Sequence, residues 1–189
     1  MNRFLFKALF LTAFFLISGI FAPVRGQSQA PIRKQAPLFF RTAVSRYYQA
    51  PEEQVALASR GKIKDEELSV LFLIVQRGRV SQEKIAQLRG HGASWLTTAR
   101  RFGVTPEAFY VPLKTPKAPF KKILGYYKSR KRTQWKKIVL RDGEIVNLVN
   151  LKFLSDFYKC APETIADWRA KGKSYVDINA ELQSRAENR

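Results

Sequence analysis

Apolar positions recur at helical spacing over most of the chain. Near residue 40, residues three or four positions apart make one apolar face: Phe39, Phe40, Ala43, Val44 and Tyr47. A second stripe follows the helix cap Asp142 and comprises Val146, Val149, Phe153 and Phe157. The apolar run Val70–Val75 fits a buried strand or a buried helix, but acids precede it and Gln76-Arg77-Gly78 follows it. These end signals favour a central helix, and the whole pattern predicts an all-α fold.

Three short segments share a pattern of Glu, then Leu or Trp five positions later, then Gly four positions after that. They are Glu52–Leu57–Gly61, Glu83–Leu88–Gly92 and Glu163–Trp168–Gly172. Glutamate stabilises a helix N-terminus, the cation or histidine before the glycine stabilises the C-terminus, and a left-handed glycine ends the helix. Ser94-Trp95 and Ser174-Tyr175 then predict the start of a further helix. We interpret the copies as a repeated helical hairpin, with chance recurrence as the alternative.

The N-terminal residues resemble a secretory signal peptide. Arg3 and Lys7 precede the uncharged apolar run Ala8–Ala22, and Val24-Arg25-Gly26 offers small or β-branched residues at a cleavage site. The run of 15 residues is short for a membrane span, which needs about 20. We expect export to the periplasm or outside the cell with cleavage after Gly26; an uncleaved membrane anchor is the alternative.

These signals divide the chain into five parts. They are a signal peptide (1–26), a flexible leader (27–37), a helical half with two motif copies (38–111), a basic irregular loop (112–141) and a helical half with the third copy (142–189).

Charge concentrates in residues 113–141, which we call the basic segment. The chain has 34 Lys and Arg against 15 Asp and Glu, and the basic segment contributes eleven cations and no acid. Its prolines and Gly125 predict an irregular loop, with which a short extended pair, Ile123–Tyr127 and Trp135–Leu140, is compatible. Cations neutralise a polyanion, and aromatic rings can stack on bases or sugars. The candidate binding residues are Lys114, Lys117, Lys121, Lys122, Tyr126, Tyr127, Lys128, Arg130, Lys131, Arg132, Trp135, Lys136 and Lys137.

One segment resembles a helix-turn-helix DNA-binding unit. Ala99 and Gly103 occupy the positions of that motif's alanine and turn glycine, Val104 follows the glycine, and Phe102 and Phe109 are apolar where its helices pack. The resemblance covers Ser81–Val111 and implies recognition of duplex DNA. It departs at the second helix, which Pro112 ends early and which presents Glu107 in place of a cation.

Enzyme signatures are scarce in the sequence. His91 is the one histidine and Cys160 the one cysteine, so neither a metal-ligand pattern nor an internal disulfide can form. Glu66 and Glu67 are adjacent and are interpreted as a helix start. We predict no enzymatic activity, no cofactor and no metal.

Two functional hypotheses remain. The first is an exported binding protein whose basic segment binds an anionic polymer or surface: polysaccharide, lipid headgroups or nucleic acid. The second is a structural or adaptor protein whose helical hairpins bind an envelope protein. Binding to a polyanion should weaken steeply with salt, whereas apolar helix contacts should not.

Overall fold

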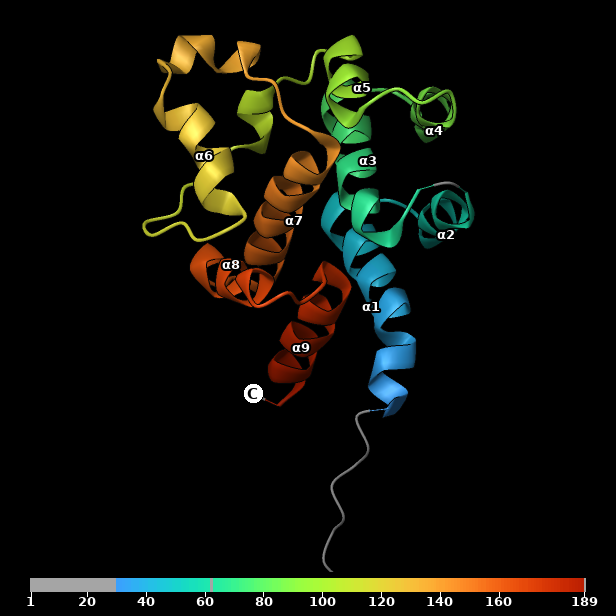
Figure 1. The fold of residues 1–189 in the computed structure, drawn as a ribbon. Coiled ribbons are helices and arrows are strands. Elements are labelled where there is room, and N and C mark those ends of the chain that lie inside the picture. Colours follow the sequence, from blue (N-terminus) through green and yellow to red (C-terminus); the bar gives the residue numbers. More distant parts are fainter. Residues whose placement is uncertain (1–29, 62, 189) are drawn as a thin grey trace, which may run out of the picture.

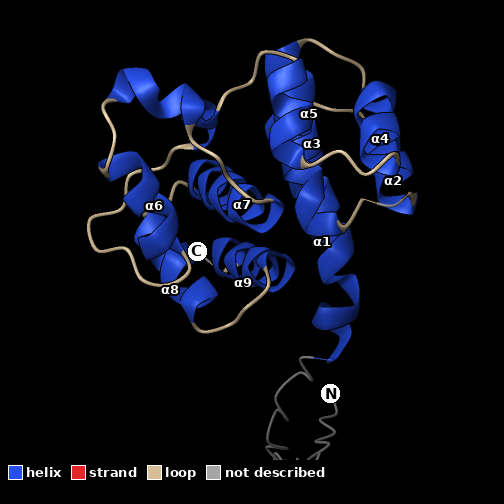
Figure 2. Ribbon diagram, turned by 45° about the horizontal axis from the view of Figure 1, so that its top comes forward, coloured by secondary structure: helices blue, strands red, loops and turns tan. Residues whose placement is uncertain are grey.

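The computed structural model describes residues 30–61 and 63–188, and every regular element within them is a helix (Figures 1 and 2). The predicted all-α class is therefore confirmed. The predicted signal peptide lies outside the described residues. The α-helices are α1 (Ala30–Tyr48), α2 (Glu52–Arg60), α3 (Asp65–Gly78), α4 (Gln82–Gly90), α5 (Trp95–Arg101), α6 (Phe120–Lys128), α7 (Asp142–Tyr158), α8 (Pro162–Ala170) and α9 (Tyr175–Glu187). Two 3-10 helices are η1 (Pro106–Phe109) and η2 (Arg132–Lys137).

Helices from both ends of the chain build one core. α1 packs along α9, α3 packs along α7, and α1 also contacts α3 (Figure 1). α3 is apolar on nearly all sides, as its sequence predicted, and its residues from Leu68 to Ile74 are buried. The two expected helical halves therefore share a single hydrophobic cluster.

A buried polar contact sets the register between the two central helices. Ser69 Oγ of α3 donates a 2.9 Å hydrogen bond to Asn150 Oδ1 of α7. Asn150 Nδ2 donates to the Glu66 carbonyl at 2.8 Å and to the Val146 carbonyl at 2.9 Å. Because these groups have no access to water, sliding α3 along α7 would leave them unpaired, which is costly.

α1 begins earlier than the sequence analysis expected. The segment 27–37 was predicted to be a flexible leader, yet α1 starts at Ala30 and contains Pro37. Ala36 and Phe40 are buried. α1 as a whole packs along α9, and the burial of Ala36 shows that tertiary packing already begins within the predicted leader.

The α3–α4–α5 and α7–α8–α9 units share the geometry of their helix ends. α3 and α7 are followed by Arg79 and Lys159, whose φ values are +50° and +52°. α4 and α8 each have 9 residues and are followed by Gly92 (φ +83°) and Gly172 (φ +85°). Equivalent residues of the two units are 80 positions apart in the sequence, as Gly92 and Gly172 are. The predicted helix stops at both glycines are confirmed, and their origin by duplication stays a prediction.

The first motif copy departs from the other two. Gly61 has φ −86°, so the expected left-handed stop is wrong there. In α2 the buried residue is Val55, and Leu57 is 52 % exposed. The match of Leu57 to Leu88 and Trp168 therefore does not reflect equivalent packing.

Candidate functional site

The basic segment is built on helices where the sequence analysis expected an irregular loop. That expectation, and the extended pair with it, is wrong: α6 and η2 occupy 120–128 and 132–137. Phe120, Ile123, Leu124 and Tyr127 recur at helical spacing and are all buried. The prolines precede α6 and Gly125 lies on its exposed side, so neither interrupts the helix.

The aromatic residues of the segment fix it to the body of the protein. Tyr127 is buried, and its hydroxyl donates to the Pro106 carbonyl at 2.8 Å. Burial raises the pKa of this phenol, which keeps the donor proton in place. Trp135 Nε1 donates to the Tyr127 carbonyl at 3.1 Å, and the Trp135 ring lies 4.5 Å from that of Tyr110.

This packing changes the role predicted for the rings. Tyr127 cannot stack on a ligand, because only 1 % of it is exposed. Tyr126 and Trp135 are half-buried, and the Tyr126 hydroxyl lies 3.4 Å from Glu144 Oε1. The expectation of aromatic stacking is therefore wrong for Tyr127.

The cations of the segment all point to solvent. Three have acidic partners: Lys117 with Asp167 (2.8 Å), Arg132 with Glu107 (3.0 Å) and Arg141 with Glu144 (3.9 Å). The remaining eight make no ion pair with any described residue: Lys114, Lys121, Lys122, Lys128, Arg130, Lys131, Lys136 and Lys137. An ordered scaffold thus carries a surface of uncompensated positive charge.

Helix α8 anchors the start of the segment. The Lys114 backbone N–H donates to Glu163 Oε1 at 3.1 Å, three residues before the ion pair of Lys117 with Asp167. The hydrogen bond from Lys114 lowers the pKa of Glu163, so this acceptor stays ionised at neutral pH. Glu163 therefore does more than begin a helix, the only role its sequence position predicted.

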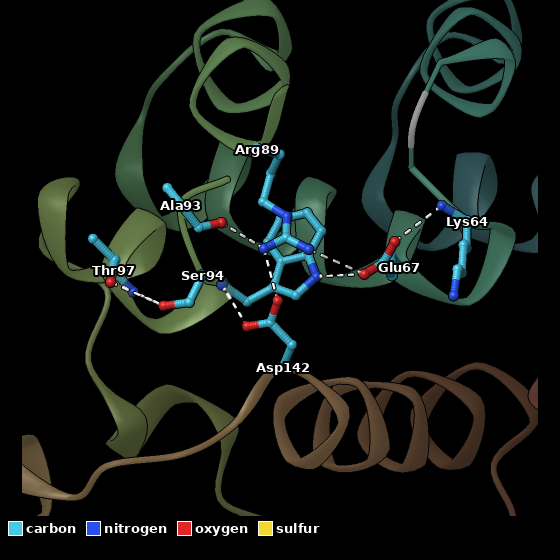
Figure 3. A network of polar contacts seen from close by, with 8 residues as sticks. Lys64, Glu67, Arg89, Ala93, Ser94, Thr97 and Asp142 are labelled. Carbon is cyan, nitrogen blue, oxygen red and sulfur yellow. Dashed lines mark hydrogen bonds and ion pairs between the residues drawn. The ribbon is translucent and has the colours of Figure 1, made fainter. Parts of the chain in front are cut away.

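A polar network anchors the end of the segment at Asp142 (Figure 3). Asp142 Oδ1 accepts from the Trp95 backbone N–H at 2.7 Å, and Oδ2 accepts from Arg89 Nη1 at 2.7 Å. Arg89 Nη2 and Trp95 Nε1 both donate to Glu67 Oε1, at 3.3 and 3.0 Å. Glu67 Oε2 also accepts from the Lys64 backbone N–H at 3.0 Å. The network joins α3, α4, α5 and α7 directly beside Arg141.

An open groove of about 780 Å³ lies between α6 and the first turns of α7. Three cations border it, and its floor is largely apolar. The lining residues are Ala118, Pro119, Lys121, Lys122, Ile123, Arg141, Gly143, Glu144 and Asn147. Lys121 and Lys122 are among the residues predicted from sequence, whereas the α7 residues come beside them only in the tertiary fold.

The segment resembling a helix-turn-helix unit retains the turn but lacks a full recognition helix. Gly103 has φ +74°, and Ala99 and Val104 are buried as in that motif. The second helix is reduced to the four residues of η1. Pro106 and Phe109 of η1 are buried, and its exposed Glu107 pairs with Arg132. This element presents no cationic surface to a DNA groove.

Comparisons with protein families, characterised proteins and solved structures find no match to the chain. No group of three or more metal-ligating side chains occurs among the described residues. Within residues 30–61 and 63–188, no helix combines the length and the apolarity that a membrane span requires.

Proposed function

We propose that this protein is a non-enzymatic, exported binding protein that attaches to an anionic polymer or envelope surface through its basic segment. The observation that carries the proposal is the set of eight exposed cations that make no ion pair with a described residue, five of which lie on α6 and η2. Fixed cations lose less conformational entropy on binding than cations on a mobile chain would. The helix-turn-helix alternative has little support, because η1 is too short to read a groove.

Charge reversal tests the proposal. In the variant Lys121→Glu, Lys122→Glu, Lys131→Glu and Lys136→Glu, we expect binding to heparin to fall by at least about 100-fold at low salt. The dependence of log K on log salt should become less steep by about four. The measurement is titration calorimetry with wild type and variant at several salt concentrations. Arg132 is left intact because it pairs with Glu107.

A matched control places the same four reversals elsewhere. Arg60, Lys84, Arg101 and Lys171 are exposed and lie outside the basic segment. Their replacement by Glu changes net charge equally, so it should weaken heparin binding by less than about tenfold. Equal losses in the two variants would mean that binding follows net charge alone, and the basic segment would not be the site.

Export is part of the same proposal and rests on the sequence pattern of residues 1–26. Protein recovered from its own cells should begin at Gln27, because cleavage is expected after Gly26. Intact-mass spectrometry measures this directly. A soluble cytoplasmic pool that retains Met1 would contradict export.

The adaptor function is the second candidate, and exposed apolar residues of α1 and α2 favour it. Leu38 is 60 % and Leu57 is 52 % exposed. A groove of about 260 Å³ between these helices is lined by Leu38, Ala56 and charged neighbours. If the protein retains its partner from envelope extracts at high salt, and Leu38→Ser with Leu57→Ser releases it, this candidate replaces the first.

A further inference from the structure

The groove between α6 and α7 combines positive charge with an apolar floor. Lys121, Lys122 and Arg141 border it, and Pro119 and Ile123 contribute apolar surface. A ligand that satisfies both needs an anionic group next to aliphatic carbon. A nucleic acid backbone supplies the anion, but of the rings that would stack on its bases, Tyr127 is buried and Trp135 packs on Tyr127.

Asn147 offers the groove a neutral hydrogen-bond donor. Its Oδ1 accepts from Arg169 Nε at 3.1 Å and from the Tyr175 hydroxyl at 3.0 Å. The Tyr175 hydroxyl also lies 3.1 Å from the Asn147 carbonyl, so it is Arg169, which can only donate, that fixes which amide atom is oxygen. Nδ2 makes no hydrogen bond to any described residue. A phosphate oxygen at the groove could therefore accept from this amide as well as from the cations.

Glu144 is the one acid that lines the groove, and its carboxylate is already engaged. Oε2 accepts from the Arg141 backbone N–H at 2.8 Å, which caps α7, and Oε1 lies 3.4 Å from the Tyr126 hydroxyl. The Arg141 side chain lies 3.9 Å from the same carboxylate. The groove has three cations and one acid, and the carboxylate of that acid already accepts hydrogen bonds. The groove therefore carries excess positive charge.

An exposed aliphatic side chain lies in the same short extended segment as Arg141. Residues 138–141 alternate between core and solvent: Ile138 and Leu140 are buried, whereas Val139 and Arg141 are exposed. Val139 is 72 % exposed, the highest value among the large exposed apolar residues of the described chain. Because extended backbone points alternate side chains to one side, Val139 and Arg141 share a face.

We infer that this groove receives the phosphate headgroup of an anionic phospholipid at a membrane surface. Lys121, Lys122, Arg141 and the Asn147 amide contact the phosphate, and the apolar floor together with Val139 contacts the glycerol and upper acyl carbons. Basic residues flanking an apolar side chain are typical of proteins that lie on anionic bilayers. This inference rests on the proposed function and names the anion within it.

Vesicle binding tests the inference. The probe is co-sedimentation with vesicles of equal parts phosphatidylcholine and phosphatidylglycerol, against vesicles of phosphatidylcholine alone. Wild type should bind only the anionic vesicles. The groove variant Lys121→Ala, Lys122→Ala and Arg141→Ala should bind them about 100-fold more weakly. Val139→Ser should weaken vesicle binding about fivefold and leave heparin binding unchanged.

The control variant removes three other cations of the same segment: Lys128→Ala, Lys131→Ala and Lys136→Ala. These residues are exposed and do not line the groove. The control should lose less than about tenfold on vesicles and as much as the groove variant on heparin. Circular dichroism of each variant checks that the helices are intact.

Each outcome decides between the two claims. If wild type binds heparin but not anionic vesicles, the lipid inference is wrong and the proposed function stands. If wild type binds neither, the proposed function fails as well. If it binds vesicles and the two triple variants lose equally, the membrane contact is diffuse and the groove is not the headgroup site.

Discussion

Replacing Trp95 by alanine is expected to lower the free energy of unfolding by about 4 kcal/mol. The side chain is completely buried at the start of α5, where it packs in the main core. Its removal leaves a large cavity and also deprives Glu67 Oε1 of a 3.0 Å hydrogen bond. In a protein of this size the melting temperature should fall by about 8–16 °C. Urea and thermal unfolding followed by circular dichroism measure both quantities.

Trp168→Ala is the matched control for that substitution. Trp95 is fully buried, whereas Trp168 on α8 is only partly buried. Arg185 and Lys173 cover its ring, at 4.6 and 5.2 Å. The cost of Trp168→Ala should therefore be about 1–2 kcal/mol. Equal losses at the two positions would contradict the packing described above.

Local features of the fold were predictable because local chemistry determines them. The serine caps are an example: Ser94 and Ser174 accept from the backbone N–H groups of Thr97 and Asp177, at 3.1 and 3.0 Å. The left-handed glycines after α4 and α8 are another. In each case the signal lies within one helical turn, and the physics needs no distant partner.

The basic segment was predicted less well because two local signals conflict there. Prolines and a high density of cations favour a loop, whereas Phe120, Ile123, Leu124 and Tyr127 have helical spacing. Burial of that apolar face against the core decides for a helix, since packing outweighs intrinsic propensity. A helical period in a segment rich in cations is the signal that would have located α6.

The groove and the polar network could not be predicted from sequence, because distant residues form them. The contacts of Trp95 with Glu67 and Asp142 span 28 and 47 positions. Glu67 is adjacent to Glu66, and the sequence favoured one role for both, as a helix start. In the structure Glu66 Oε1 accepts from the backbone N–H of Tyr175 at 2.5 Å, so the two carboxylates cap different units.

Arg89→Met is expected to cost about 3 kcal/mol of unfolding free energy, the second largest effect we predict. The Arg89 side chain is 17 % exposed and bonds to two carboxylates, Glu67 and Asp142. It also donates to the Ala93 carbonyl at 2.5 Å and lies 4.3 Å above the Trp95 ring. Methionine preserves most of the apolar contact, so the loss reports the partly buried charges left without their cation. Chemical denaturation of purified variants measures it.

Arg169→Met provides the internal comparison, because Arg169 is the residue equivalent to Arg89 in the second unit. It donates to the Lys173 carbonyl at 3.0 Å and lies 4.9 Å above the Tyr175 ring, as Arg89 does with Ala93 and Trp95. The side-chain acceptor of Arg169 is the neutral Asn147, so removing the guanidinium leaves no carboxylate without its partner. We expect a cost of about 1–2 kcal/mol. If Arg169→Met destabilised the protein as much as Arg89→Met, the carboxylates would not account for the larger effect, and the shared helix-end contact and ring stacking would.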